Sequence, residues 1–448
     1  MKTSARHPVQ NQLKIPQLNN CHKLEIIAYF QQAWHLENDV FKSIIDEDIF
    51  YKNPDKLRNP LIFYVGHSAV FYINKLVIAG WNIKRINPDY EKIFEMGVDP
   101  EYPGELIKII NKLRQYSLKS LENYRQQVYQ TIIDLIENTD LDLPITPSSK
   151  WWAIIMGIEH QRIHIETSSM LLRQLPLDVL KAPSGWDYLP SLGKPPQQEM
   201  ITVEGGEVNL GITLEHPFYG WDVDYGSREV EVKPFRVSKY MVTNGEFLDF
   251  VRDGGYENPE FWSPEAWKWL NGENRHHPKF WLCEGQFYRY RALFHEFDLP
   301  LDYPAEVNHH EAMAFLRYQE AKTGEKYQLM SEAQWHLARQ KDDESLTNYN
   351  LNLRYHSPNP VAEGAVSDSG IVDLRGNVWE WLGETFTPLS GFTPHYLYED
   401  YSAPFFDNRH YLLVGGAWMT NGTESLPFYR NWFRPHFYQH AGFRLVQN

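Results

Sequence analysis

Apolar residues recur at every third or fourth position through the first 180 residues of the chain. This spacing gathers them on one face of a helix, and it predicts four long helices. Pro144 and Pro147 separate the last two. Long helices joined by short connections favour a helical bundle, in which a site lies between facing helices. The predicted helices span residues 23–38, 62–76, 103–137 and 149–175.

The pattern changes after residue 180. Residues 181–198 hold four prolines without periodicity, which is typical of a linker. Short apolar alternations then indicate strands between Gly, Asn and Asp turns, with a few short helices and long loops rich in Trp and Tyr. The sequence therefore predicts an N-terminal arm at 1–19, a helical domain at 20–180 and an irregular α+β domain at 199–448. The strands are expected at 201–203, 207–210 and 230–237, and the helices at 243–253, 309–323 and 331–339.

Composition narrows the function classes. The length of 448 residues suits two domains, and a net charge of −15 disfavours nucleic acid, which needs clustered cations. Two cysteines, Cys21 and Cys283, exclude a disulfide framework and a cysteine-rich metal cluster. Polar residues interrupt the apolar stretch at 60–81, and the N-terminus lacks an apolar export signal, so we expect no membrane span and a cytoplasmic location.

A histidine pair carries the clearest chemistry. His160 and His164 are four residues apart in a predicted helix, so both imidazoles face the same side, one turn apart, as in many divalent-metal sites. Such a pair also arises by chance, so a third ligand decides the matter. Glu166 lies roughly 200° around the helix from His164, which makes it a supporting residue rather than a ligand.

His67 is the better third ligand. It stands in the middle of an apolar predicted helix, where an unpaired imidazole costs about 1–3 kcal/mol. The competing interpretation is a core histidine with a hydrogen-bond partner. The His160 and His164 pair on another helix favours His67 as a metal ligand instead. Three neutral imidazoles suit zinc, iron, nickel or copper, so the ligand set alone does not name the metal.

The histidine pair is part of the first of four motifs along the chain. The chain carries H-x3-H-x-E at 160–166, GNVWEW at 376–381, GGAW at 415–418 and AGFR at 441–444. In this combination it resembles the ergothioneine and ovothiol sulfoxide synthases, which join a DinB-like four-helix bundle to a domain like the formylglycine-generating enzyme, with a C-type-lectin-like fold. The resemblance covers nearly the whole chain, and it implies ferrous iron, Fe(2+), held by His67, His160 and His164.

The resemblance also implies roles in the second domain. A loop tyrosine facing the bound thiol and oxygen corresponds to Tyr398, with Tyr396 as its nearest competitor, and a second tyrosine corresponds to Tyr401. Asn431 and Trp432 match a pair that contacts substrate. The remaining expected substrate contacts are Arg434 and Arg444, as carboxylate clamps, although a structural role is the stronger interpretation for Arg444.

Within the family, the ovothiol branch is the closer match. Runs such as RNPLIFYVGHSAVFYINKL and FRPHFYQHAGFR resemble 5-histidylcysteine sulfoxide synthase. Ile163 replaces a glutamine, and Phe433 an acidic residue, of the ergothioneine enzymes. The expected substrates are therefore L-cysteine, L-histidine and O2. Since the chain ends four residues after Arg444, a methyltransferase acting downstream would be a separate protein.

Three alternatives stay open. The same chemistry on hercynine, with cysteine or γ-glutamylcysteine, is the first. A non-redox, DinB-like thiol transferase using zinc or nickel is the second. A lectin-like binding module at 199–448 is the third. Formylglycine generation itself is disfavoured, because Cys283 is the one cysteine of that domain and cannot form a two-thiol copper site.

Overall fold

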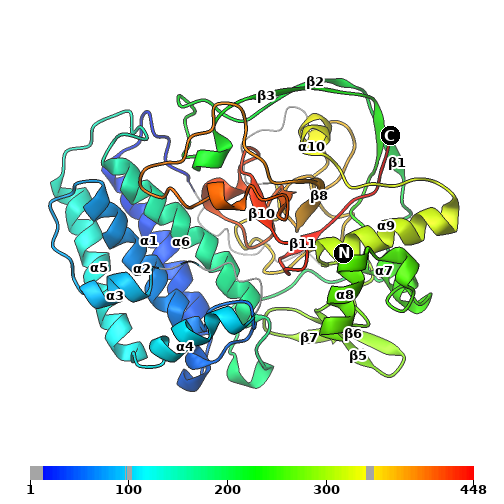
Figure 1. Cartoon of the computed structure of the whole chain (residues 1–448), viewed down its shortest axis with the longest axis horizontal. Coiled ribbons are helices and arrows are strands. Elements are labelled where there is room, and N and C mark those ends of the chain that lie inside the picture. The colour runs from blue at the N-terminus through cyan, green and yellow to red at the C-terminus, as the bar shows by residue number, and fades with distance from the viewer. Residues whose placement is uncertain (1–13, 96, 98–102, 340–347) are drawn as a thin grey trace, which may run out of the picture.

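The computed structural model describes residues 14–95, 97, 103–339 and 348–448. Most of the predicted N-terminal arm, residues 1–19, lies outside these ranges. The helices of the first 180 residues gather on one side of the molecule, and the sheets lie on the other with the later helices, while α6 runs along the boundary (Figure 1). The predicted fold class, a helical bundle followed by an irregular α+β domain, is confirmed.

Four long helices build the bundle. α2 packs on both α5 and α6, and α1 packs on the same two helices. The predicted helix at 103–137 is wrong in its continuity, because residues 114–117 interrupt it and the Ser117 side chain caps the new helix by accepting from Ser120 N–H. Short helices α3 (Pro88–Ile93) and α4 (Ile107–Leu113) fill the connection. The long helices are α1 (Lys23–Lys42), α2 (Leu61–Ile78), α5 (Leu118–Asn138) and α6 (Trp151–Leu172).

α2 is the core helix of the bundle. By length and composition it could cross a membrane, but 89% of it is buried inside the protein. Gly157 of α6 lies against the Tyr72 ring of α2, where a Cβ atom would come within 2.3 Å of the ring. A side chain at this position would therefore hold the two helices apart. The glycine lets α2 and α6 approach closely.

The second domain is built on short sheets. A four-stranded sheet has the order β10-β9-β8-β11, and a three-stranded sheet has the order β1-β4-β12. The predicted strand at 230–237 is two strands, β3 and β4, because Pro234 lacks the N–H that a continuous ladder needs. The strands are β1 (Met200–Val203), β2 (Gly206–Leu210), β3 (Arg228–Val232), β4 (Phe235–Ser238), β8 (Trp379–Thr385), β9 (Tyr411–Val414), β10 (Asn431–Phe433), β11 (Ala441–Gly442) and β12 (Val446–Gln447).

Helices and a small sheet surround these strands. The three predicted helices of this domain correspond to α7 (Asn244–Arg252), α9 (His309–Thr323) and α10 (Glu332–Arg339). Their cap signals are local: Thr243 caps α7 and Asn308 caps α9, each with a glutamate three residues later. The sequence reasoning missed α8 (Pro264–Glu273) and the sheet of β5 (Trp281–Glu284), β6 (Phe287–Arg291) and β7 (Glu296–Asp298).

One face of α6 joins the two domains. Five of its polar residues, at alternating spacings of three and four, bond to the second domain or stand beside it. Glu159 accepts from Thr423 N–H at 3.0 Å, and Arg173 pairs with Glu306 at 2.6 Å. The opposite face is left to meet α2. The joining face comprises Glu159, Arg162, Glu166, Ser169 and Arg173.

Candidate metal centre and active site

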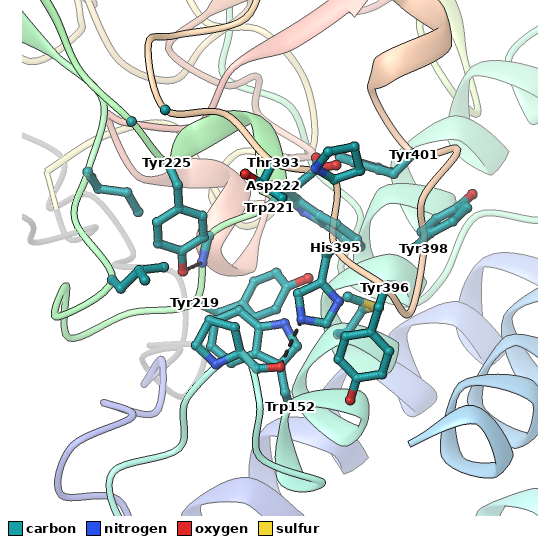
Figure 2. A pocket seen from close by; sticks show the side chains of 18 of the residues that line it. Trp152, Tyr219, Trp221, Asp222, Tyr225, Thr393, His395, Tyr396, Tyr398 and Tyr401 are labelled. Atoms are coloured by element: carbon teal, nitrogen blue, oxygen red, sulfur yellow. Dashed lines mark hydrogen bonds between the residues drawn. The ribbon is translucent and has the colours of Figure 1, made fainter. Parts of the chain in front are cut away.

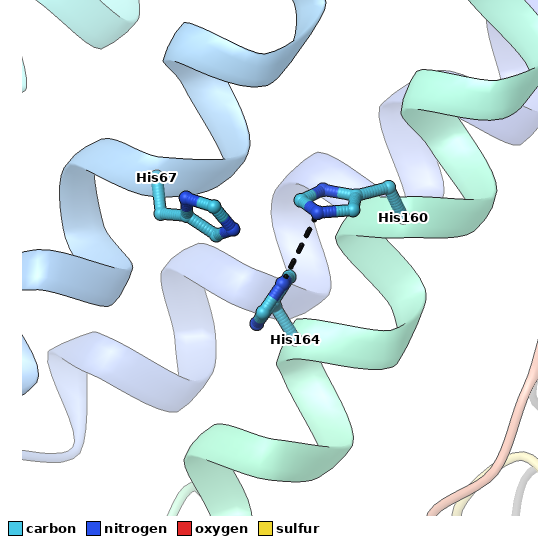
Figure 3. Close-up of side chains that lie close together, drawn as sticks. All are labelled: His67, His160 and His164. Atoms are coloured by element: carbon cyan, nitrogen blue, oxygen red, sulfur yellow. Dashed lines mark hydrogen bonds between the residues drawn. The ribbon is translucent and has the colours of Figure 1, made fainter. Parts of the chain in front are cut away.

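Three histidines converge between α2 and α6 (Figure 3). His67 comes from α2, and His160 and His164 from α6. One nitrogen from each ring lies within 4.8 Å of the others. The Nε2 atoms of His160 and His164 are 3.2 Å apart. His67 and His160 are buried and His164 is partly exposed, so the group is open on the His164 side.

The three rings fit a divalent metal ion. His67 Nδ1 donates to the Phe94 carbonyl at 2.6 Å, which leaves its Nε2 free to bind. Burial lowers the pKa of His67 to about 4 and holds the pKa of His160 and His164 well below the usual range. All three are therefore neutral at pH 7, as ligands must be. Two neutral imidazole nitrogens at 3.2 Å need a proton or a cation between them.

Glu166 points away from the histidines. Its carboxylate accepts from Trp379 Nε1 and from Thr420 Oγ1, both at 2.6 Å. Both partners belong to the second domain, so this side chain ties α6 to the sheet. The carboxylate is not part of the metal-ligand group.

The second domain brings Tyr398 to the histidines. Its ring lies 6.0 Å from the His160 ring and 5.2 Å from that of Phe71, which itself stacks on His160 at 3.5 Å. Burial raises the pKa of Tyr398, so the phenol is protonated at neutral pH. Tyr396 is 48% exposed and stacks on His395 instead. The geometry thus favours Tyr398 over Tyr396.

Tyr401 lies one ring further back. It stacks on Trp221 at 4.1 Å, and its hydroxyl lies 3.4 Å from that of Tyr429. Its ring contacts Tyr398 at 5.3 Å, and no contact with the histidines is recorded for it among the described residues. This position favours a role in supporting the ring of Tyr398 over the catalytic role predicted for Tyr401, which stays a prediction.

Asn431 and Trp432 form the start of β10. Trp432 stacks on Phe386 at 4.2 Å and meets the edge of Tyr401 at 5.2 Å. The Asn431 side-chain oxygen accepts from the Trp432 N–H. Both residues are partly exposed. They lie behind Tyr401 rather than beside the histidines.

The two predicted arginine clamps differ. Arg434 is 8% exposed and directly follows β10. Arg444 is buried, pairs with Glu380 at 2.7 Å, and donates to the carbonyls of Ser238, Lys239, Val372 and Asp373. Because these groups occupy its guanidinium, the geometry favours the structural role of Arg444 over a substrate contact, which stays a prediction. It joins two backbone segments of the second domain, 238–239 and 372–373, to Glu380 of β8.

A cavity of about 680 Å³ is bordered by Tyr398 (Figure 2). Its lining is rich in Trp and Tyr and comes from residues at and just before the start of α6 and from two loops, at 212–227 and 391–401. Burial raises the pKa of Asp222, in the lining, to about 6. The sequence analysis missed this cavity, although Met156 of the lining lies one turn before His160 on the same face of α6. Its position gives a small molecule room beside Tyr398.

Comparisons with known proteins cover both domains. Residues 189–448 match the family model of the sulfatase-modifying factor enzyme 1-like domain. Hercynine oxygenase of Mycobacterium tuberculosis is 30% identical over 395 residues, covering 82% of this chain and 90% of its own. Ergothioneine biosynthesis protein 1 of Neurospora crassa is 22% identical over 97% of this chain and 59% of its own. The inactive C-alpha-formylglycine-generating enzyme 2 of Mus musculus is 26% identical over 44% of this chain.

A helical bundle joined to a sulfatase-modifying-factor domain, with converging imidazoles near their boundary, defines a class of two-domain oxidoreductases. The chain belongs to the ergothioneine and ovothiol sulfoxide synthase family.

Proposed function

We propose that the protein is a cytoplasmic, non-haem iron sulfoxide synthase that couples L-cysteine to the imidazole of L-histidine and yields 5-histidylcysteine sulfoxide. The observation that carries the proposal is the meeting of the histidine group of the first domain with Tyr398 of the second. Family membership supports the reaction class. Ile163 and Phe433, which depart from the ergothioneine pattern, support histidine as the acceptor.

The reaction balances with oxygen as the oxidant. Joining a thiol S–H to an imidazole C–H removes two electrons, and oxidising the sulfide to a sulfoxide removes two more. One O2 accepts all four, giving the sulfoxide oxygen and one water. A nicotinamide or flavin is therefore unnecessary.

His67, His160 and His164 would hold the iron. Bound Fe(2+) would supply the one-electron steps that O2 activation requires and would lower the pKa of a bound thiol. Tyr398 donates a proton from its phenol to the reacting oxygen, since burial keeps that phenol protonated. The enclosing domains hold both substrates together, which makes bond formation effectively intramolecular.

Hercynine as the acceptor is the second candidate. The name of the Mycobacterium tuberculosis relative favours it. Both candidates share the histidine group and Tyr398, so the substrate test separates them.

The test starts with protein loaded with iron without oxygen. Histidine and cysteine are added, oxygen is admitted, and the product is sought by mass spectrometry, with hercynine in parallel. Histidyl-cysteine sulfoxide from histidine supports the proposal, and product from hercynine alone supports the second candidate. The control is His160→Ala, which removes one ligand and should abolish both iron and product. Coupled product from zinc-loaded protein, or no product despite bound iron, would contradict iron-dependent coupling.

A further inference from the structure

Lys75 is buried next to the histidine group. It lies on α2 at a spacing of four from Phe71 and eight from His67, so the three side chains share one face of the helix. Lys75 is 6% exposed. Helical side chains lean toward the N-terminus, which brings its ammonium closer to the histidines than its Cα atom is.

Two aromatic rings hold the ammonium. Its Nζ atom lies 4.4 Å from the centre of the Tyr398 ring and 4.8 Å from that of Phe71. Within the described ranges, no hydrogen bond or ion pair is recorded for it. Glu95 and Asp400 act on it only through space, and burial lowers its pKa. An ammonium removed from water with only ring faces around it is incompletely compensated.

Four buried arginines of the described chain pair with carboxylates, and the buried Arg162 donates to amide and carbonyl oxygens instead. Arg125 pairs with Glu37 at 2.8 Å, and Arg430 pairs with Glu332 at 2.6 Å. The same holds for Arg173 with Glu306 and for Arg444 with Glu380. In each of these four pairs, a carboxylate of the protein balances the charge of the arginine. Lys75 differs from them because the partner that would complete its site is missing from the described protein atoms.

We propose that Lys75 binds the α-carboxylate of an amino-acid substrate at the histidine group. Phe71 contacts both groups: its ring stacks on the His160 imidazole at 3.5 Å and lies 4.8 Å from the ammonium. An amino acid whose side chain reaches the histidine group carries its α-carboxylate only a few bonds from the reacting atom, on the side where Phe71 and Tyr398 hold the ammonium. The role rests on the proposed function, which makes both organic substrates amino acids, and histidine and cysteine are the two sources of the carboxylate.

Decarboxylated analogues test the role directly. Iron-loaded protein without oxygen binds but cannot turn over, so calorimetry can compare histidine with histamine and cysteine with cysteamine. We expect the wild type to prefer one acid over its analogue by about tenfold or more, as a charge-assisted hydrogen bond implies. Lys75→Met should abolish that preference, leave the affinity for the analogue unchanged, and retain iron. The pair that responds identifies which substrate Lys75 holds.

Lys322→Met is the matched control. This lysine also lies over a ring, 5.1 Å from that of Tyr318, but it is on α9 of the second domain. It should keep the preference of the wild type. Should Lys75→Met fail to fold, Lys75→Gln removes the charge with less change in polarity, and Lys75→Arg should restore the preference in part.

Two results would overturn the role of Lys75. If the neutral variants keep both acid-over-analogue preferences, Lys75 does not bind a carboxylate, whereas coupled product from the wild type would leave the proposed function standing. If the iron-loaded wild type binds neither amino acid and forms no product, both the role and the proposed function fail.

Discussion

Burial controls the chemistry of the individual residues at the metal centre. It keeps His67, His160 and His164 neutral, and it keeps the phenol of Tyr398 protonated. The same low-polarity surroundings therefore favour metal ligation by the imidazoles and proton donation by the phenol. The residues thus divide into three that would hold metal and one that would deliver a proton.

Tyr398→Phe should lower sulfoxide formation by about 10²-fold or more, because a positioned acid contributes about 10²–10⁴-fold and the variant loses only the hydroxyl. Iron content should stay at the wild-type level. Product analysis and metal analysis of the same sample check this. Tyr401→Phe is the matched control. It should lower sulfoxide formation far less, since the hydroxyl of Tyr401 faces Tyr429. Equal losses in the two variants would contradict the assignment of Tyr398.

At the scale of the elements, α6 contacts other parts of the protein through two different faces. The face with Glu159, Glu166 and Arg173 binds the second domain, and the face with His160 and His164 meets α2. Two features set its place: the close approach at Gly157 and the buried pair at Arg173. Each can be tested separately.

Gly157→Ala should destabilise the protein by about 1–3 kcal/mol, because the new methyl group overlaps the Tyr72 ring. It should also weaken metal binding, since α2 and α6 carry different ligands and would move apart. Chemical denaturation and metal titration measure the two effects. Gly272→Ala, in α8, is the control, because its Cβ meets nothing within 4 Å. It should stabilise by about 0.4–1 kcal/mol.

Arg173→Met should lower the free energy of unfolding by about 3–5 kcal/mol, because it leaves the buried carboxylate of Glu306 without its arginine partner. The wild-type pair also predicts a pH dependence. Burial alone would raise the pKa of Glu306, but the Arg173 charge and a hydrogen bond with His440 lower it to about 2. The stabilisation is therefore complete above the unfolded value of about 4.3 and is lost as the pH falls toward 2.

Denaturation at a series of pH values checks this prediction. The Arg173→Met variant should show a weaker fall in stability between pH 4.3 and 2 than the wild type. Lys42→Met removes a pair that is largely exposed, with Asp39 at 3.8 Å, and should change stability little. An unchanged acid profile in Arg173→Met would contradict the role of this pair.

At the scale of the whole molecule, the proposed site draws on both domains. The bundle supplies the imidazoles, Phe71 and Lys75, and the second domain supplies Tyr398 and the rings behind it. Since the ligands come from two helices, a bound metal ion should also stabilise the bundle.

Adding Fe(2+) at 100 times its dissociation constant should stabilise the metal-free protein by about 2.7 kcal/mol, and a chelator should reverse this. The mechanism is linkage: metal binds the folded site and not the separated helices. Anaerobic thermal unfolding with and without metal measures it. His164→Ala should show almost no response. An equal response in that variant would place the bound metal elsewhere.

Local pattern was sufficient for much of this description. Helical periodicity predicted the bundle, and the spacing of His160, His164 and Glu166 correctly separated the side of the helix that faces α2 from the side that carries Glu166. The histidine in the apolar run of α2 was recognised because a buried imidazole needs a partner. Each of these features depends only on residues that are neighbours in the chain, so the sequence by itself determines it.

Long-range contacts decided the rest. The internal partners of Arg444 and the distance of Tyr401 from the histidines depend on which segments pack together. The role inferred for Lys75 also depends on a long-range contact. In the sequence this lysine is one cation at the end of an apolar helix, and it becomes a candidate substrate contact only because Tyr398, more than 300 residues later, packs over it. Burial and partner are properties of the folded chain, so only the tertiary structure could assign them.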